Sequence, residues 1–212
     1  MERTVAKCLL EIKSVYFGFD DEFRSKDGFC MPVYTDNRLI LSYPIVRNAL
    51  TKWLSRHVKE NYPDVEMIVG TAVNGISFAT LLSVSLNLPM AYVLEKTKEH
   101  GLKNRFEGII KPHTKVIIVD DVVCTGKTLL EVNDVLKDLG FDCLGAVSIF
   151  SYDLESTNQM LKEAGIHNTS LTNFDVVSLI GMQNGLINYE QYLQTKKFKE
   201  NPYSLDWKKN SK

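Results

Sequence analysis

The stretch from Val116 to Thr128, VIIVDDVVCTGKT, constrains the fold of this chain more strongly than any other. It runs from four apolar residues through two adjacent aspartates into a short polar turn. A strand that is apolar throughout has both of its faces covered, which is typical of parallel sheets. After the turn, apolar residues recur at helical spacing as far as Gly140, a residue typical of helix ends. The stretch therefore predicts a strand, a turn and a helix of an α/β protein.

The same alternation recurs along the chain and predicts a parallel sheet with helices on both faces. Residues 15–43 differ, because Asp, Gly and Pro break them into short apolar and aromatic pieces. That composition predicts a small lobe of short strands and turns. The expected strands are 66–71, 89–94, 114–121 and 142–150, and the expected helices are 2–14, 44–60, 75–88, 125–140, 153–165, 173–184 and 188–199.

Composition narrows the class of protein. The 212 residues, 44% of them hydrophobic, suffice for one full core. A net charge of −1 gives no global basic field, so we expect no nucleic-acid partner. No apolar run approaches the length of a membrane span, so we expect no membrane partner. None of the four cysteines lies in a C-x-x-C pair, which argues against zinc and redox motifs and favours reduced thiols in the cytoplasm.

Three polar loops follow the expected strands, at the edge of a parallel sheet where ligands bind. They are GTAVNG, EKTKEHGLKNRFEG and DDVVCTGKT. The last one leads into a helix N-terminus, where backbone N–H groups and the helix dipole favour an anion. A plain helix cap would also use Thr125 and Gly126, but it explains neither Asp120 nor Asp121. Two carboxylates beside a phosphate site suit the vicinal hydroxyls of a sugar.

The other two loops fit the same kind of ligand. GTAVNG has a glycine at each end of a strand-to-helix turn and is a second candidate anion site. The loop over 95–111 is rich in lysine and arginine and is long for a compact domain. It is either a solvated surface loop or a basic lid over a polyphosphate. A Walker P-loop is excluded, because Asp121 stands where that motif requires glycine.

VIIVDDVVCTGKT resembles the phosphoribosyl diphosphate (PRPP) signature of the type I phosphoribosyltransferases. Three further stretches resemble the orotate phosphoribosyltransferases in particular, and the likeness covers nearly the whole chain. They are SKDGFCMPVYTDNRLILSYPIVR, VEMIVGTAVNGISFA and YVLEKTKEHG.

The resemblance implies a doubly wound, mainly parallel α/β sheet flanked by helices, with a small hood from the N-terminal segment. It implies one phosphoribosyltransferase domain over 1–212, with an N-terminal helix and hood (1–43), a core carrying the PRPP site (62–151) and C-terminal helices (152–212). The implied reaction transfers the phosphoribosyl group of PRPP to orotate, giving orotidine 5′-monophosphate and diphosphate for pyrimidine synthesis. Magnesium would be carried by PRPP rather than by a protein cage. The implied assembly is a homodimer whose lid, 95–111, enters the partner's site.

Carried over by position, the resemblance implies roles for individual residues. Asp120 and Asp121 would hold the ribose hydroxyls, while Lys98 and His100 would close over the diphosphate from the other subunit. Lys26 would approach the base from the hood, and Cys124 would lie beside it. The residues implied to bind PRPP are Thr71, Ala72, Val73, Asn74, Lys98, His100, Asp120, Asp121, Val122, Val123, Cys124, Thr125, Gly126, Lys127 and Thr128.

Several positions depart from the family's pattern. Leu94 replaces an arginine that grips the diphosphate, Cys124 replaces a serine or threonine, and Lys127 replaces a small residue. Glu95 stands beside the expected catalytic lysines, and Val73, Asn74 and Ser77 alter the first loop. Three hypotheses therefore stay open: an orotate phosphoribosyltransferase, a divergent phosphoribosyltransferase for another base, and a non-catalytic protein that binds PRPP or a nucleotide.

Overall fold

The central sheet of the protein has six strands in the order β10-β9-β8-β5-β6-β7 in the computed structural model, which describes residues 1–19, 23–25, 28–95 and 105–208. Neighbouring strands are parallel, except that β7 is antiparallel to β6. The strands are β5 (Met67–Thr71), β6 (Met90–Val93), β7 (Phe106–Glu107), β8 (Lys115–Val123), β9 (Asp142–Ser151) and β10 (Asn168–Asn173).

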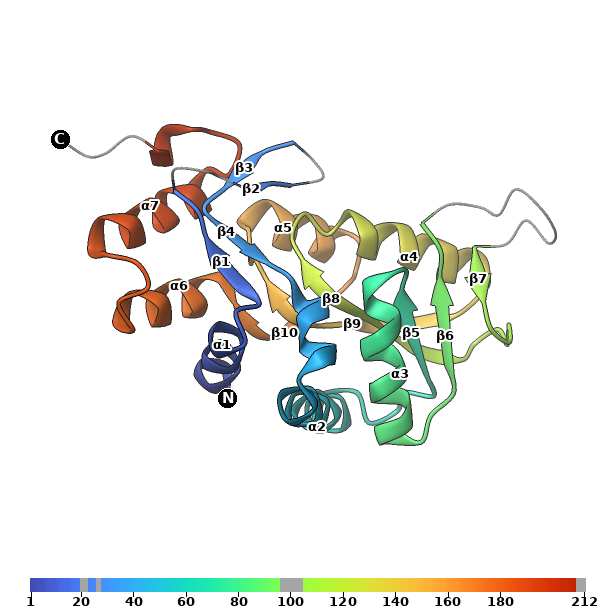
Figure 1. Ribbon diagram of the computed structural model, residues 1–212. Helices are drawn as coiled ribbons and strands as arrows, with labels where there is room; N and C mark the ends of the chain where they lie inside the picture. Colours follow the sequence, from blue (N-terminus) through green and yellow to red (C-terminus); the bar gives the residue numbers. More distant parts are fainter. Residues whose placement is uncertain (20–22, 26–27, 96–104, 209–212) are drawn as a thin grey trace.

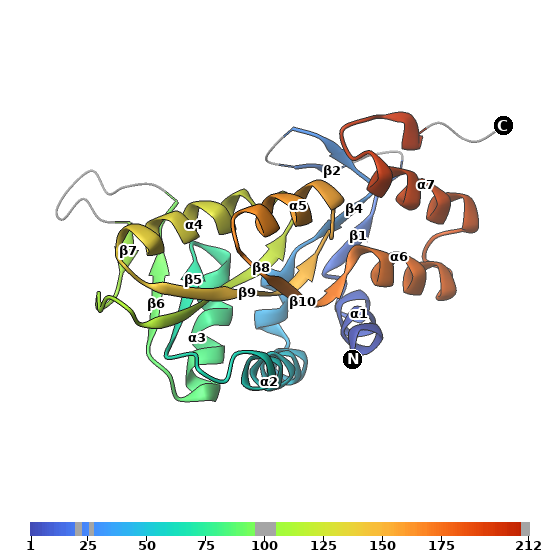
Figure 2. The ribbon, with the colours of Figure 1, turned by 180° about the vertical axis from the view of Figure 1, so that it is seen from behind.

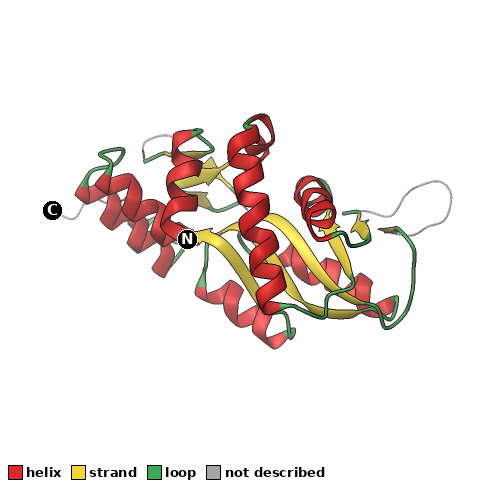
Figure 3. Ribbon diagram, turned by 90° about the horizontal axis from the view of Figure 1, so that it is seen from below, coloured by secondary structure: helices red, strands yellow, loops and turns green. Residues whose placement is uncertain are grey.

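Helices cover both faces of this sheet (Figure 1). In Figure 1, α2 and α3 lie on one side of the strands and α4 and α5 on the other, and Figure 2 shows the same two layers from behind. In the view from below, one long helix lies across the strands of the sheet (Figure 3). The helices are α1 (Glu2–Glu11), α2 (Pro44–Asn61), α3 (Asn74–Leu86), α4 (Lys127–Asp138), α5 (Glu155–Glu163), α6 (Phe174–Gln183) and α7 (Tyr189–Glu200).

The two faces of β8 enter different cores, which explains why its sequence is apolar without alternation. Ile117 and Val119 belong to the cluster that includes α1, α2, α3 and α6. Val116 and Ile118 belong to the cluster beneath α4. All four side chains are fully buried. Because successive residues of a strand point to opposite faces, a strand buried on both sides must be apolar at every position.

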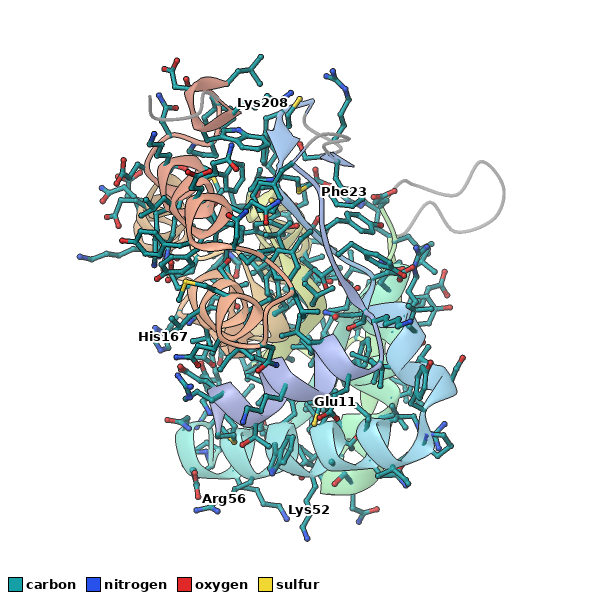
Figure 4. The ribbon with its side chains drawn as sticks, turned by 60° about the vertical axis from the view of Figure 1, so that its left-hand side comes forward. Glu11, Phe23, Lys52, Arg56, His167 and Lys208 are labelled. Carbon is teal, nitrogen blue, oxygen red and sulfur yellow. The ribbon has the colours of Figure 1, made fainter. Side chains whose placement is uncertain are left out.

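The N-terminal hood consists of four short strands packed beside the carboxyl end of the sheet and the C-terminal helices (Figure 1). They form two antiparallel pairs, β1 with β4 and β2 with β3. A 3-10 helix, η1 (Asn37–Ser42), leads from β4 into α2, and η2 (Asp206–Lys208) follows α7. Figure 4 shows Phe23 of β2 and Lys208 of η2 at the same end of the molecule, far from Lys52 and Arg56 of α2. The strands are β1 (Val15–Phe17), β2 (Phe23–Arg24), β3 (Cys30–Met31) and β4 (Val33–Thr35).

The predicted α/β class, the doubly wound sheet and the hood are confirmed, and each predicted strand and helix of the core is present. Three predictions of detail are wrong. The strand predicted to end at Asp121 continues to Val123. The region predicted to hold only C-terminal helices contributes β10, which pairs with β9 along the sheet. The basic loop predicted over 95–111 ends early, because Phe106 and Glu107 pair with β6 as a sixth strand.

These errors have physical causes. β10 has the sequence NTSLTN, whose polar residues hide the strand from any hydrophobic pattern. β7 has two residues, too few to show a pattern, and is fixed by Phe106 stacking on Phe141 at a centroid distance of 5.1 Å. β8 passes beyond Asp121 because Val122 and Val123 continue to pair with β9.

Candidate active site

The site expected from the sequence lies at the end of β5, beside the last residues of β8. Asp120 and Asp121 lie near the end of β8, and Thr71 is the last residue of β5. The hydroxyl of Thr71 donates to Oδ1 of Asp120 at 2.7 Å. All three side chains are buried. The structure therefore brings the acidic pair together with the start of the GTAVNG loop, as the sequence predicts.

The carboxyl groups of this pair affect each other's ionisation. Burial, followed by the negative charge of Asp120, raises the pKa of Asp121 to about 7. The backbone N–H of Asp121 also donates to Oδ1 of Asp120 at 2.9 Å, so that oxygen accepts two hydrogen bonds. Raised carboxyl pKa values are common where a site is built to bind a ligand, because the ligand supplies the partners that burial removed.

The helix that follows β8 begins in a way that favours an anion. Gly126 is the N-cap of α4 and has a left-handed φ of 72°. Within the described part of the chain, no side chain caps the helix there. Glycine has no side chain that could accept from the first N–H groups of α4, as a Ser, Thr, Asp or Asn cap would. A Cβ at Gly126 would lie 3.0 Å from Thr157 Cγ2 and 3.1 Å from Met160 Cε of α5, so the turn is tightly enclosed.

A second helix begins in the same manner at the end of β5. Val73 is the N-cap of α3, and no side chain among the described residues caps this helix either. The peptide bond between Ala72 and Val73 is cis, and the Val73 side chain is 80% exposed. A Cβ at Gly75 would lie 2.4 Å from both Thr71 Oγ1 and Val119 O. Glycine is therefore required at this position, because the helix starts in direct contact with β8.

The remaining positions that the sequence predicts to bind PRPP lie in the turn between β8 and α4. Cys124 is half-buried, and its carbonyl accepts a hydrogen bond of 2.8 Å from the Thr157 hydroxyl. Lys127 and Thr128 are the first residues of α4, and both are exposed. Lys127, one of the departures noted in the sequence, therefore lies on the exposed surface at the start of the helix.

The position where the family's pattern has an arginine is occupied differently here. Leu94 is half-buried and forms two hydrogen bonds with Arg105. Leu94 N donates to Arg105 O, and the side-chain Nε of Arg105 donates to Leu94 O, each at 2.8 Å. The Arg105 guanidinium also forms an ion pair of 3.1 Å with Glu131 of α4. Arg105 thus connects Leu94, at the start of the basic loop, to α4, and its guanidinium group faces Glu131.

Three predicted site residues lie outside the described residues: Lys26, Lys98 and His100. The structure also reveals residues that the sequence did not single out. The side-chain amide of Asn37 donates to the main-chain carbonyl of Asp121 at 2.8 Å. Tyr152 donates from its hydroxyl to Val33 O at 2.8 Å. Both bonds join segments that are far apart in the sequence, so no local sequence pattern predicts them.

Comparison with known proteins agrees with this geometry. The family model of the phosphoribosyl transferase domain matches residues 40–174. Orotate phosphoribosyltransferase from Bacillus subtilis is 38% identical over 207 residues, covering 98% of this chain and 96% of the relative. The enzyme of the same name from Bacillus cytotoxicus is 37% identical, covering 98% and 99%.

Solved structures share the fold. Orotate phosphoribosyltransferase from Aeropyrum pernix superimposes with a TM-score of 0.74 at 24% identity, over 87% of this chain and 99% of that one. UMP synthase from Leishmania donovani gives 0.80 at 23% identity over 94% of this chain, which spans 42% of that longer chain. The fold and the strand-end site define a phosphoribosyltransferase. The chain belongs to this family and, within it, to the orotate phosphoribosyltransferases.

Proposed function

We propose that this protein transfers the phosphoribosyl group of PRPP to orotate, giving orotidine 5′-monophosphate and diphosphate in pyrimidine synthesis. One observation carries the proposal: a buried pair of adjacent carboxyl groups lies directly before a helix start that no described side chain caps. The pair suits the ribose hydroxyls and the helix start suits the 5′-phosphate. The curated relatives named orotate phosphoribosyltransferase support orotate as the base.

Each loop takes one part of PRPP in this proposal. Asp120 and Asp121 accept hydrogen bonds from the ribose hydroxyls, and the turn from Val122 to Thr128 surrounds the 5′-phosphate. The diphosphate lies against the loop from Thr71 to Asn74, at the start of α3. Two helix N-termini thus face the two anionic ends of one molecule, where their dipoles are favourable.

The chemistry is a displacement at the anomeric carbon. The base nitrogen of orotate forms a bond to this carbon as the bond to the diphosphate oxygen breaks, and the electron pair leaves with the diphosphate. Charge develops on the departing group, so catalysis depends on positive charge placed around it. We assign that role to Lys98 and His100, reaching from the partner subunit, and base contacts to Lys26 and Cys124.

We propose that magnesium is carried by the substrate. Among these residues, no group of three or more His, Cys, Asp or Glu side chains is placed to hold a metal. Mg²⁺ is commonly held through one or two carboxylates together with phosphate oxygens and waters. The ion would neutralise charge on the diphosphate.

A homodimer accounts for apolar side chains that the single chain leaves in solvent near the site. Tyr43 and Ile45 at the start of α2 are exposed, and so is Val73 in the loop after β5. Covering such residues is favourable when two copies associate. We propose that the second copy covers this region and that the lid of 95–111, shortened at its end by β7, enters its site.

The remaining proposals concern organisation and location. We propose that the chain is one domain, divided as the sequence suggests into a helix and hood, a core and a C-terminal part that also supplies β10. The four cysteines, all of them described residues, form no disulfide, in keeping with a reducing compartment such as the cytoplasm. No helix among the described residues is long and apolar enough to cross a membrane.

A direct test follows orotate consumption by absorbance with purified protein, PRPP and Mg²⁺. We expect turnover that falls at least about tenfold in Asp120→Asn, because charge-assisted hydrogen bonds contribute roughly 1.5–3 kcal/mol. Lys98→Ala should reduce turnover further. Arg56→Ala, on the exposed face of α2, is the matched control and should retain wild-type turnover.

Stabilisation by PRPP without orotate turnover would contradict the proposed reaction. The half-buried thiol of Cys124 gives one specific reason to consider a different base, because a thiol is a weaker hydrogen-bonding partner than a hydroxyl. A screen of other bases would then distinguish a divergent transferase from a binding protein.

A further inference from the structure

β5 ends before β8 does, and this leaves one edge of β8 without a neighbouring strand at the acidic pair. The last paired residues are Gly70 of β5 and Val119 of β8. On the other side of β8, the pairs with β9 pass from Asp120–Ser148 to Val122–Phe150 and omit Asp121. Asp121 is therefore a described residue of β8 that is paired with neither neighbouring strand.

Two side chains form hydrogen bonds with the backbone groups of Asp121. The N–H of Asp121 donates to Oδ1 of Asp120 at 2.9 Å, and the carbonyl of Asp121 accepts from Nδ2 of Asn37 at 2.8 Å. Asn37 is completely buried. Its own Oδ1 accepts from the Thr35 hydroxyl at 2.9 Å, which fixes the orientation of the amide. Thr35 ends β4 of the hood, so this chain of hydrogen bonds runs from the hood to the acidic pair.

We propose that Asn37 is a positioning residue for the reaction: it holds the Asp121 peptide, and with it the ribose-binding carboxyl groups, at a fixed place relative to the hood. The proposal rests on the proposed role of Asp120 and Asp121 in binding ribose. A buried carbonyl that loses its donor is costly, so the peptide would turn to find another partner. A turn of this peptide moves the side chains attached on either side of it.

A second bond between hood and sheet provides a matched control. Tyr152, at the end of β9, donates its hydroxyl to Val33 O of β4 at 2.8 Å. Burial raises the pKa of Tyr152 well above its ordinary value, so the hydroxyl stays a donor. Tyr152→Phe therefore removes a buried bond between hood and sheet but leaves the Asn37–Asp121 bond in place. If Asn37 acted merely by attaching the hood, the two substitutions would have the same effect.

The test is calorimetric titration of PRPP and of inorganic diphosphate, each with Mg²⁺, into the full-length protein and its variants. PRPP engages the carboxyl groups through its ribose, whereas diphosphate alone does not. We expect Asn37→Ala to weaken PRPP binding at least about tenfold and to leave diphosphate binding within about twofold. Tyr152→Phe should lower Tm and keep both affinities within about threefold. Equal weakening of both ligands by Asn37→Ala, unchanged PRPP binding, or the same loss in Tyr152→Phe would overturn the proposal.

A second variant covers the case in which Asn37→Ala does not fold. Asn37→Asp keeps the size of the side chain and the acceptor for Thr35 but lacks the donor when ionised. It should bind PRPP at least about tenfold more weakly than wild type at pH 8. The difference in PRPP affinity between this variant and wild type should be smaller at pH 5.5, where a protonated carboxyl group can donate. Wild-type affinity at pH 8 would overturn the proposal.

Failure of the ribose assignment itself would look different. Asp120→Asn and Asp121→Asn would then bind PRPP as tightly as wild type. If both weaken PRPP binding while the Asn37 variants do not, the role of Asn37 alone is wrong.

Discussion

The central sheet and the N-terminal hood differ in what holds them in place. β8 has nine residues and pairs with β5 on one side and β9 on the other. The hood strands have two or three residues each, in two-stranded pairs that are marginal in water by themselves. Side-chain hydrogen bonds from Asn37 and Tyr152, and aromatic contacts such as Phe29 with Phe198, join them to the rest.

This difference bears on function. Backbone pairing fixes where the carboxyl ends of β5 and β8 lie, so phosphate and ribose contacts are set by the sheet. The distance from those contacts to the hood depends on a few side chains. Substitutions that disturb the apolar packing against the sheet should therefore destabilise the protein, and substitutions at the hood should separate stability from ligand binding.

The largest effect should come from Gly75→Ala. The new Cβ would lie 2.4 Å from Val119 O, a main-chain atom inside the sheet that cannot move aside. We expect the free energy of unfolding to fall by about 3 kcal/mol or more, at the upper end of overpacking effects. Thermal unfolding measures this. Gly165→Ala is the comparison, because its Cβ would meet no atom within 4 Å and only its left-handed φ of 75° opposes the substitution, at a cost of about 1–2 kcal/mol. A loss in Gly75→Ala no larger than that in Gly165→Ala would contradict the expected clash with β8.

The next effect tests the hood. Tyr152→Phe leaves the buried carbonyl of Val33 without its donor and should cost about 1–2 kcal/mol of unfolding free energy. Chemical denaturation at neutral pH measures the change. A loss below about 0.3 kcal/mol would show that the aromatic contacts of Tyr152 with Phe150 and Phe174 hold the hood without the hydroxyl.

The third effect lies at the boundary between the two regions and depends on pH. Burial and Asp120 raise the pKa of Asp121 to about 7 in the folded chain, above its ordinary value of 3.8. The contribution of this carboxyl group to the free energy of unfolding is fully present below about pH 4 and is lost as pH rises through 7. At pH 8, Asp121→Asn should therefore have a free energy of unfolding about 1 kcal/mol or more above that of wild type, and a higher Tm. The advantage should shrink at pH 5, and an equal advantage at both values would contradict the assigned cause.

The smallest effect is expected on the outer face of α2. Arg56 projects outward from the helix, as Figure 4 shows, and pairs with Glu60 at 2.7 Å with both side chains largely exposed. Exposed pairs of this kind contribute about 0.5 kcal/mol or less. Arg56→Ala should change Tm by less than about 2 °C, and a larger fall would show that this face has a structural role.

The strand ends were predictable and the hood contacts were not, for one physical reason. A strand that is buried on both faces consists of consecutive apolar residues. β5, β8 and β9 could therefore be placed from the sequence, together with the polar loops that follow them. β10 is polar because its neighbours supply hydrogen bonds such as Ser148 with Ser170, and no periodicity marks it. Asn37 is one polar residue in an irregular segment, and its partner lies 84 residues further along the chain.

A competition assay tests the central claim most directly. Orotate, uracil, adenine and hypoxanthine would be supplied together at equal concentration with PRPP and Mg²⁺, and the nucleotide products separated by chromatography. The account predicts orotidine 5′-monophosphate as the dominant product, with one diphosphate released per nucleotide. A different nucleotide as the main product, or no nucleotide from a protein that PRPP stabilises, would contradict it.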